Sequence, residues 1–129
     1  MPKNKLKIAV GSLKIGRLAK KLVSRTLNKN RLTYGPLTAE FENKFAKAHG
    51  CHYGLFTVSG TSALQIALDA MKKIYRWEDG DEVIVPALTF IATSNIVLQN
   101  NMKPVFVDVD PVTYNINPDL IEKKINKST

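Results

Sequence analysis

Apolar residues recur at helical spacing in four stretches of the chain. The pattern predicts helices over residues 12 to 28, 37 to 48, 61 to 75 and 89 to 100. Gly50 follows the second of these stretches and is a typical C-terminal stop signal. The first predicted helix is amphipathic, because lysines and arginines lie between its apolar positions, which are Ile15, Leu18, Ala19, Leu22, Val23 and Leu27.

Three short, continuously apolar and β-branched runs alternate with these helices. They cover residues 53 to 58, 82 to 86 and 104 to 109, and each is predicted to be a strand buried on both faces. Asn117 and Pro118 then form a typical helix start, with Asn as the N-cap. An alternation of strands and helices indicates a parallel sheet in an α/β fold.

The junction between the run at 53 to 58 and the following helix carries four small residues, Ser59, Gly60, Thr61 and Ser62. A helix N-terminus presents unpaired N–H groups and the positive end of the helix dipole. A glycine at that point lets an anion approach the backbone, and hydroxyl groups add donors, so the stretch suits a phosphate. Ordinary helix capping explains the same residues and stays open as an alternative. The spacing matches neither a P-loop nor a dinucleotide fingerprint.

A second candidate position follows the strand predicted at 82 to 86. Thr89, Phe90 and Thr93 come at the carboxyl end of that strand, where ligands bind in open α/β sheets. An aromatic side chain beside a phosphate site can stack on a planar ring. The alternative is that Phe90 belongs to the hydrophobic core.

Charge is distributed unevenly along the 129 residues. The formal net charge is +8, and residues 1 to 31 hold ten Lys and Arg with no Asp or Glu. The basic residues of this arm could attract nucleic acid or an anionic membrane. The arm has no interleaved aromatic residues and has helical spacing, which favours a solvated helix face instead.

Cysteine and histidine usage argues against disulfides and metal. Cys51 is the single cysteine, so no intrachain disulfide can form, and its spacing from His49 and His52 fits no usual zinc pattern. No apolar run is long enough for a signal peptide or a membrane span. We therefore expect a cytoplasmic protein without metal.

Four stretches taken together resemble one known family. "YGPLTAEFENKFAKAHG", "VSGTSALQIALDA", "GDEVIVPALTFIATSN" and "PVFVDVDPVTYNINPDLIEKKI" occur in the order and spacing of the DegT/DnrJ/EryC1/StrS aminotransferases. These sugar aminotransferases use pyridoxal phosphate (PLP). The resemblance covers residues 12 to 129, and linked motifs are more specific than any single one.

The resemblance implies a fold, a reaction and a set of binding residues. The fold would be the N-terminal part of the large domain of a type I, aspartate aminotransferase-like PLP enzyme, with a mainly parallel sheet and flanking helices. The enzyme would be a homodimer that transfers an amino group, usually from glutamate, to a keto group of a nucleotide-linked sugar. By the same resemblance, Gly60, Thr61 and Ser62 would bind the phosphate of PLP, Phe90 would stack on its ring, and Tyr34 and Gly35 would lie near the substrate.

No catalytic residue can be assigned within this sequence. In the family, the lysine that binds the cofactor covalently and the aspartate that pairs with the pyridine nitrogen lie beyond the region matched here. Lys103 lies in no comparable motif and is interpreted as a solvated connector, and Asp108 and Asp110 as turn residues. We therefore expect an N-terminal fragment that is inactive alone, with a basic arm at 1 to 31 and an incomplete PLP-binding domain at 32 to 129.

Three alternatives to an aminotransferase remain at this point. Some family members dehydrate sugars with PLP, and others regulate. The third alternative is a nonenzymatic module that binds phosphate or nucleic acid through the basic arm.

Overall fold

A computed structural model describes residues 14 to 29 and 32 to 129. Residues 12 and 13, which belong to the first predicted helix, lie outside the described residues. The chain divides into two compact units, Met1–Gly54 and Leu55–Thr129. The predicted boundary after residue 31 stays a prediction.

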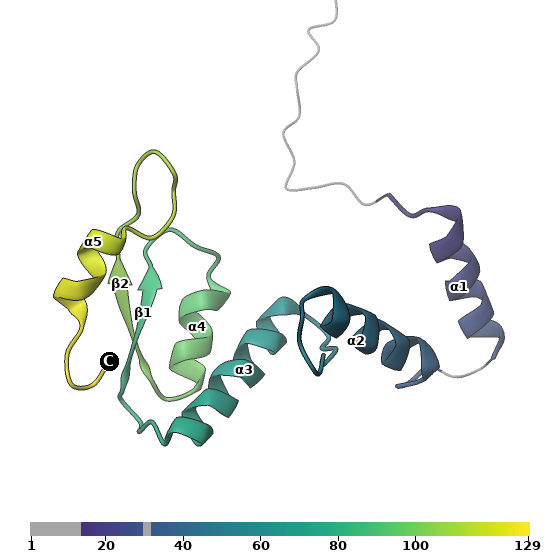
Figure 1. Cartoon of the computed structure of the whole chain (residues 1–129), viewed down its shortest axis with the longest axis horizontal. Helices are drawn as coiled ribbons and strands as arrows, with labels where there is room; N and C mark the ends of the chain where they lie inside the picture. Colours follow the sequence, from purple (N-terminus) through teal and green to yellow (C-terminus); the bar gives the residue numbers. More distant parts are fainter. Residues whose placement is uncertain (1–13, 30–31) are drawn as a thin grey trace, which may run out of the picture. The chain divides into compact units, whose positions relative to one another are not determined.

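The first unit contains two helices, α1 (Arg17–Asn28) and α2 (Pro36–Ala48) (Figure 1). Helix α2 starts where the sequence predicts, because Pro36 occupies its first turn and needs no hydrogen-bonded N–H there. It ends at Ala48, and Gly50 adopts a left-handed backbone with a φ of 65°. The helix predicted at 37 to 48 is confirmed, and the one predicted at 12 to 28 is confirmed from Arg17 onward, whereas residues 14 to 16 are not helical.

A close backbone contact joins α2 to the segment that follows it. A Cβ atom placed on Gly54 would lie 2.7 Å from the main-chain oxygen of Glu42 and 3.4 Å from its carbonyl carbon. A backbone oxygen cannot swing aside as the end of a flexible side chain would. The chain can pass α2 at this distance only with glycine at position 54.

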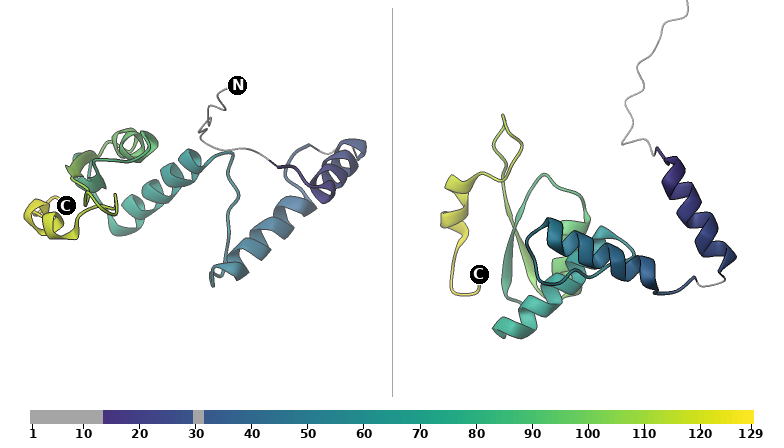
Figure 2. Two further views of the ribbon diagram at one scale, coloured as in Figure 1. Left: turned by 90° about the horizontal axis from the view of Figure 1, so that it is seen from above. Right: turned by 45° about the vertical axis from the view of Figure 1, so that its right-hand side comes forward.

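The second unit alternates helices with two parallel strands. Its elements are α3 (Gly60–Tyr75), β1 (Glu82–Pro86), α4 (Ala92–Gln99), β2 (Lys103–Val107), α5 (Pro118–Ile121) and a short 3₁₀ turn, η1 (Glu122–Lys124). The strands pair in parallel with Glu82 opposite Lys103 and Pro86 opposite Val107. In Figures 1 and 2 they lie side by side, with α4 packed beside them. The predicted α/β fold with a parallel sheet is confirmed.

The strand predicted over residues 53 to 58 is wrong for the chain as described. This segment forms no strand, and Tyr53 and Val58 are 92% and 93% exposed. A strand requires a neighbour that accepts and donates its backbone hydrogen bonds. Among the described residues only β1 and β2 pair in a sheet, so no strand supplies backbone hydrogen bonds along this segment.

The prediction that the strands are buried on both faces is also wrong here. The hydrophobic core consists of Leu68 from α3, Val85 from β1 and, from α4 and its following turn, Ile96, Val97 and Met102. Phe106 of β2 remains 52% exposed. The two strands pack against α4, and α3 packs on α4, so only part of the apolar strand surface is buried.

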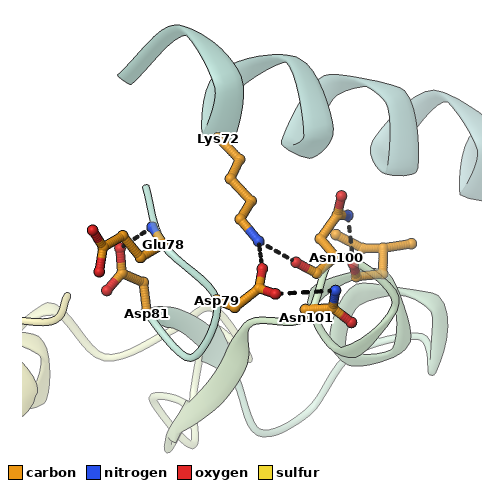
Figure 3. A network of polar contacts seen from close by, with 7 residues as sticks. Lys72, Glu78, Asp79, Asp81, Asn100 and Asn101 are labelled. Carbon is orange, nitrogen blue, oxygen red and sulfur yellow. Dashed lines mark hydrogen bonds and ion pairs between the residues drawn. The ribbon is translucent and has the colours of Figure 1, made fainter. Parts of the chain in front are cut away.

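A polar network joins three elements at the amino end of the sheet (Figure 3). The ammonium of Lys72, near the end of α3, donates to the Asp79 carboxylate and to the main-chain oxygen of Asn100, at 2.7 Å. The Asn101 amide also donates to Asp79, at 3.4 Å, and the buried Asn100 amide donates to the oxygen of Ile96. Lys72 thus connects the end of α3 to the turn between α4 and β2, with its side chain only 15% exposed.

We expect Gly54→Ala to destabilise the protein by about 1 to 3 kcal/mol, the usual cost of forcing extra volume into a packed site. Thermal or urea unfolding monitored by circular dichroism measures this cost. Gly60→Ala is the matched control, because a Cβ at Gly60 meets no atom within 4 Å. Equal stability of the Gly54→Ala variant and the wild type would show that the segment does not pack this closely on α2.

Lys72→Met should lower the melting temperature more than Lys73→Met does. Methionine keeps most of the side-chain volume but leaves the Asn100 carbonyl without its charged donor, a loss of about 1 to 3 kcal/mol. Lys73 is the control, since it makes a 2.7 Å pair with Asp69 in an exposed position on the same helix.

The difference in stability between the wild type and Lys72→Met should also depend on pH. The bond from Lys72 lowers the pKa of Asp79 below its ordinary 3.8. A lowered carboxyl pKa stabilises the folded state above the ordinary value and loses that effect as the pH falls through the folded-state pKa. The difference between wild type and Lys72→Met should therefore narrow below about pH 4, and a difference that widens in acid would contradict the assigned pair.

Candidate functional site

The start of α3 leaves two backbone donors uncommitted. Ser59 is the N-cap, and its hydroxyl oxygen accepts from the Ser62 N–H at 3.1 Å. The Ser59 carbonyl accepts from the Ala63 N–H, also at 3.1 Å. Within the described part of the chain, the N–H groups of Gly60 and Thr61 have no hydrogen-bond partner, as expected for the first turn of a helix.

The surroundings of these two donors suit a phosphate group. The space beside Gly60 is open where a Cβ would stand, and Thr61 is exposed. The first turn of α3 has no acidic residue to repel an anion, and the helix dipole favours negative charge there. The Ser59 and Ser62 hydroxyls lie 3.0 Å apart beside the donors. The N–H of Ser62 serves the cap, so Ser62 offers only its hydroxyl.

Phe90 lies in the loop that follows β1 and is not a core residue. Its side chain is 76% exposed, which excludes the core interpretation for the chain as described. The loop backbone is held in place, since the Ala87 N–H donates to the Val107 oxygen at 2.8 Å and the Thr93 N–H donates to the Phe90 oxygen at 2.9 Å. An aromatic ring is thereby presented to solvent from a fixed loop.

Chain direction relates these two features. In Figure 1, α3 and β1 run in roughly opposite directions, and the end of α3 leads into the amino end of β1. The start of α3 therefore lies away from the amino end of the sheet, and the Phe90 loop leaves the carboxyl end of β1. In open α/β sheets this is the end where ligands bind.

The two predicted substrate residues belong to the first unit. Gly35 is the N-cap position of α2, and Tyr34 precedes it. The Tyr34 hydroxyl donates to Oε2 of Glu42 at 2.8 Å. This hydrogen bond to a carboxylate, with a smaller contribution from burial, raises the pKa of Tyr34.

Residues considered for metal binding or catalysis have structural contacts. The His49 ring packs against Phe45 with centroids 4.3 Å apart, and the Cys51 thiol lies 3.6 Å from the His49 carbonyl oxygen. No group of three His, Cys, Asp or Glu side chains among the described residues is placed to hold a metal ion. The description of Lys103 as a connector is wrong, because it begins β2 and pairs with Glu82 at 2.7 Å.

Asp110 has the turn role that the sequence predicts. Its carboxylate accepts from the Thr113 N–H at 2.7 Å and from the Val112 N–H at 3.0 Å. These bonds, chiefly those from Thr113, lower the pKa of Asp110. The carboxylate is therefore committed to its own loop.

Two features of the structure were missed by sequence reasoning. Glu42 lies eight positions from Tyr34, and Asn100 lies 28 positions from Lys72. Neither separation produces a periodic pattern, so no signal in the sequence marks these partners.

Comparison with known proteins identifies the family of this chain. The model of the DegT/DnrJ/EryC1/StrS aminotransferase family matches residues 14 to 129. The chain therefore belongs to the DegT/DnrJ/EryC1/StrS aminotransferase family.

Two curated relatives are sugar aminotransferases. The UDP-2-acetamido-2-deoxy-3-oxo-D-glucuronate aminotransferase of Pseudomonas aeruginosa is 38% identical over 107 residues, which cover 83% of this chain and 29% of that protein. The 3-oxo-glucose-6-phosphate:glutamate aminotransferase of Bacillus subtilis is 37% identical over 107 residues, 83% of this chain and 23% of that protein. The chain thus spans only about a quarter of the length of these relatives.

A solved structure is similar to this chain in both fold and sequence. The GDP-4-keto-6-deoxy-D-mannose-3-dehydratase of Escherichia coli, with bound hydrated PLP, superposes with a TM-score of 0.85 and 30% identity. The match covers 93% of this chain and 31% of that one. The predicted fold class is confirmed, and PLP is present in this relative, as the sequence resemblance implies.

One further result concerns membranes. No helix among the described residues has both the length and the apolar character that crossing a membrane requires.

Proposed function

We propose that the protein carrying this chain is a PLP-dependent aminotransferase. It moves an amino group, with glutamate as the donor, to a keto group of a nucleotide-linked sugar. The observation that supports this most is the start of α3, where the N–H groups of Gly60 and Thr61 have no hydrogen-bond partner among the described residues and the space beside Gly60 is open. By their names, one relative described above acts on a UDP-linked keto sugar, and the other acts on 3-oxo-glucose-6-phosphate and glutamate.

The residues of this chain bind and orient the cofactor. The N–H groups of Gly60 and Thr61 and the hydroxyls of Thr61 and Ser62 would hold the phosphate, and the Phe90 ring would stack on the pyridine ring. When bound, PLP supplies an electron sink for the bonds at the amino-bearing carbon. The start of α3 and the Phe90 ring would together fix the position of the cofactor, since one binds its phosphate and the other its pyridine ring.

The proposal assigns no catalytic base to this chain. We infer that this segment by itself turns over no substrate, because no lysine in it has a matching motif. We also propose that the whole protein is a cytoplasmic homodimer in which Tyr34 and Gly35 contact the sugar nucleotide. The exposed apolar residues Leu55, Phe56, Val58 and Phe106 support burial against further polypeptide.

A sugar dehydratase is the second candidate function. The observation in its favour is the TM-score of 0.85 with the Escherichia coli dehydratase. Both reactions use the same cofactor and therefore the same phosphate site. Incubation of the whole protein with PLP, glutamate and a keto sugar nucleotide separates them, since only transamination transfers nitrogen from ¹⁵N-glutamate to the sugar product.

Thr61→Glu should abolish PLP binding by the whole protein. The new carboxylate would repel the phosphate and fill its space, whereas a glutamate in the first turn favours the helix itself. Thr61→Gln is the matched control, because it adds the same volume without the charge. Titration of PLP followed by absorbance gives the affinity, and unchanged affinity in a folded Thr61→Glu protein would contradict the site.

Phe90→Ala should weaken PLP binding by about 1 kcal/mol, the scale of aromatic stacking, while Phe90→Tyr largely preserves it. Because Phe90 is 76% exposed, its truncation should barely change the free energy of unfolding. Leu88→Ala, which removes another exposed apolar side chain from the same loop, serves as the control. A lower melting temperature with intact PLP affinity would show that Phe90 packs in the core of the whole protein.

A further inference from the structure

We propose that α1 is an amphipathic helix that binds the surface of an anionic phospholipid membrane. The inference goes beyond the proposed function and does not depend on it, since it concerns a different helix from the one that begins at Gly60. It rests on two features of α1, an exposed apolar face and an exposed basic face that carries no acidic residue.

One side of α1 is apolar and open to solvent. Leu18, Val23 and Leu27 are each more than half exposed, and no residue of the helix is buried. At about 3.6 residues per turn, these three positions form one continuous face with Ala19 and Leu22. The sequence alone favours a solvated helix face for this arm. Solvation accounts for the basic residues, but it does not explain an apolar face that is exposed as well.

The other side of α1 is a row of positive charges. Arg17, Lys21 and Arg25 recur at every fourth position, Lys29 follows at the same spacing, and all four side chains are exposed. No carboxylate among the described residues pairs with them. Like charges four positions apart repel each other and destabilise a helix, and residues 1 to 31 contain no Asp or Glu that could offset this. We therefore expect an anionic partner for this row.

The borders between the two faces suit a membrane surface. Around the helix, Lys20 comes next to Leu27 on one border, and Arg25 comes next to Leu18 on the other. The aliphatic stems of lysine and arginine can lie along an apolar surface while their charged ends stay at the level of the headgroups. Helices with an apolar face and a face rich in Lys and Arg lie in the boundary between headgroups and acyl chains.

The length of α1 fits a helix that lies on a membrane. Its 12 residues rise about 18 Å at 1.5 Å per residue, whereas the hydrocarbon core of a bilayer is about 30 Å thick. The helix would therefore lie parallel to the surface. Leu18, Val23 and Leu27 would contact the acyl chains, and the basic side chains would lie among the lipid phosphates.

Nucleic acid and protein each account for only one of the two faces. DNA or RNA would neutralise the basic row but leave the apolar face in water, and residues 14 to 29 include no aromatic side chain on which a base could stack. A polypeptide packed on the apolar face would leave the row of like charges uncompensated. An anionic membrane contacts both faces at once, so the observations favour it.

The test is flotation of the whole protein, loaded with PLP, with lipid vesicles. One set of vesicles contains equal parts of phosphatidylglycerol and phosphatidylcholine, and the other contains phosphatidylcholine alone. Fluorescence anisotropy with a labelled DNA duplex is measured in parallel. Thermal melting and PLP titration by absorbance establish that each variant is folded and binds its cofactor.

A first pair of variants tests the apolar face. Leu18→Gln combined with Leu27→Gln should weaken binding to the anionic vesicles at least about 10-fold, because two leucines no longer leave water. Glutamine is a good helix former, so the helix itself is retained. Val112→Gln combined with Ile125→Gln is the matched control, since both side chains are exposed in the second unit.

A second pair tests the basic row. Lys21→Gln combined with Arg25→Gln should weaken binding about 20- to 30-fold, since each positive charge near an anionic surface contributes about 5-fold. Lys123→Gln combined with Lys124→Gln removes the same charge from another exposed part of the chain and is the control. Binding of the wild type should also fall as the salt concentration rises.

We expect the wild type to float with the anionic vesicles and not with phosphatidylcholine alone. Absence of flotation in a folded wild type would overturn the inference. DNA binding without flotation, retained by the Leu18 and Leu27 variant, would overturn it in favour of nucleic acid. Equal losses in the control variants would also overturn it, because net charge would then explain the binding. None of these results changes the PLP affinity, so the proposed function is tested separately.

Discussion

The contact of Lys72 with the turn between α4 and β2 fixes the direction of α3, and the rest of the second unit depends on that direction. Lys72 lies near the end of the helix, donates to Asp79 and to the Asn100 carbonyl, and is mostly buried. Once the end of α3 is held at the amino side of the strands, its start must stand at their carboxyl side. A contact far from the predicted ligand thereby positions the groups that would bind it.

The two ends of the sheet differ in how their polar groups are used. At the amino end the groups satisfy one another, as Lys103 pairs with Glu82 at 2.7 Å and the Asn126 amide donates to Glu82, also at 2.7 Å. At the start of α3 the N–H groups of Gly60 and Thr61 have no partner in the part of the chain that the structure describes, and Phe90 is exposed in the loop after β1. Satisfied groups stabilise the fold, and uncommitted groups are available to a ligand. The groups that stabilise the fold therefore lie near the end of α3, and the groups available to a ligand lie at its start.

The sequence predicts those features that depend on near neighbours in the chain. The helices and the strand at β1 follow from local periodicity, and the N-cap at Asn117 accepts from the Asp119 N–H as its position suggests. The segment at 53 to 58 was predicted wrongly, because apolar character shows that a strand is possible and not that a partner strand is present. The partners of Tyr34 and Lys72 were not predictable, since each contact depends on how the chain turns between distant positions.

Amide chemical shifts would locate the PLP phosphate on the protein. With ¹⁵N-labelled whole protein, addition of PLP should shift the N–H resonances of Gly60 and Thr61 strongly, while those around Lys72 at the other end of α3 stay in place. Such a result would show that the phosphate binds at the free start of the helix. Strong shifts elsewhere, with Gly60 and Thr61 unmoved at saturating PLP, would contradict the account.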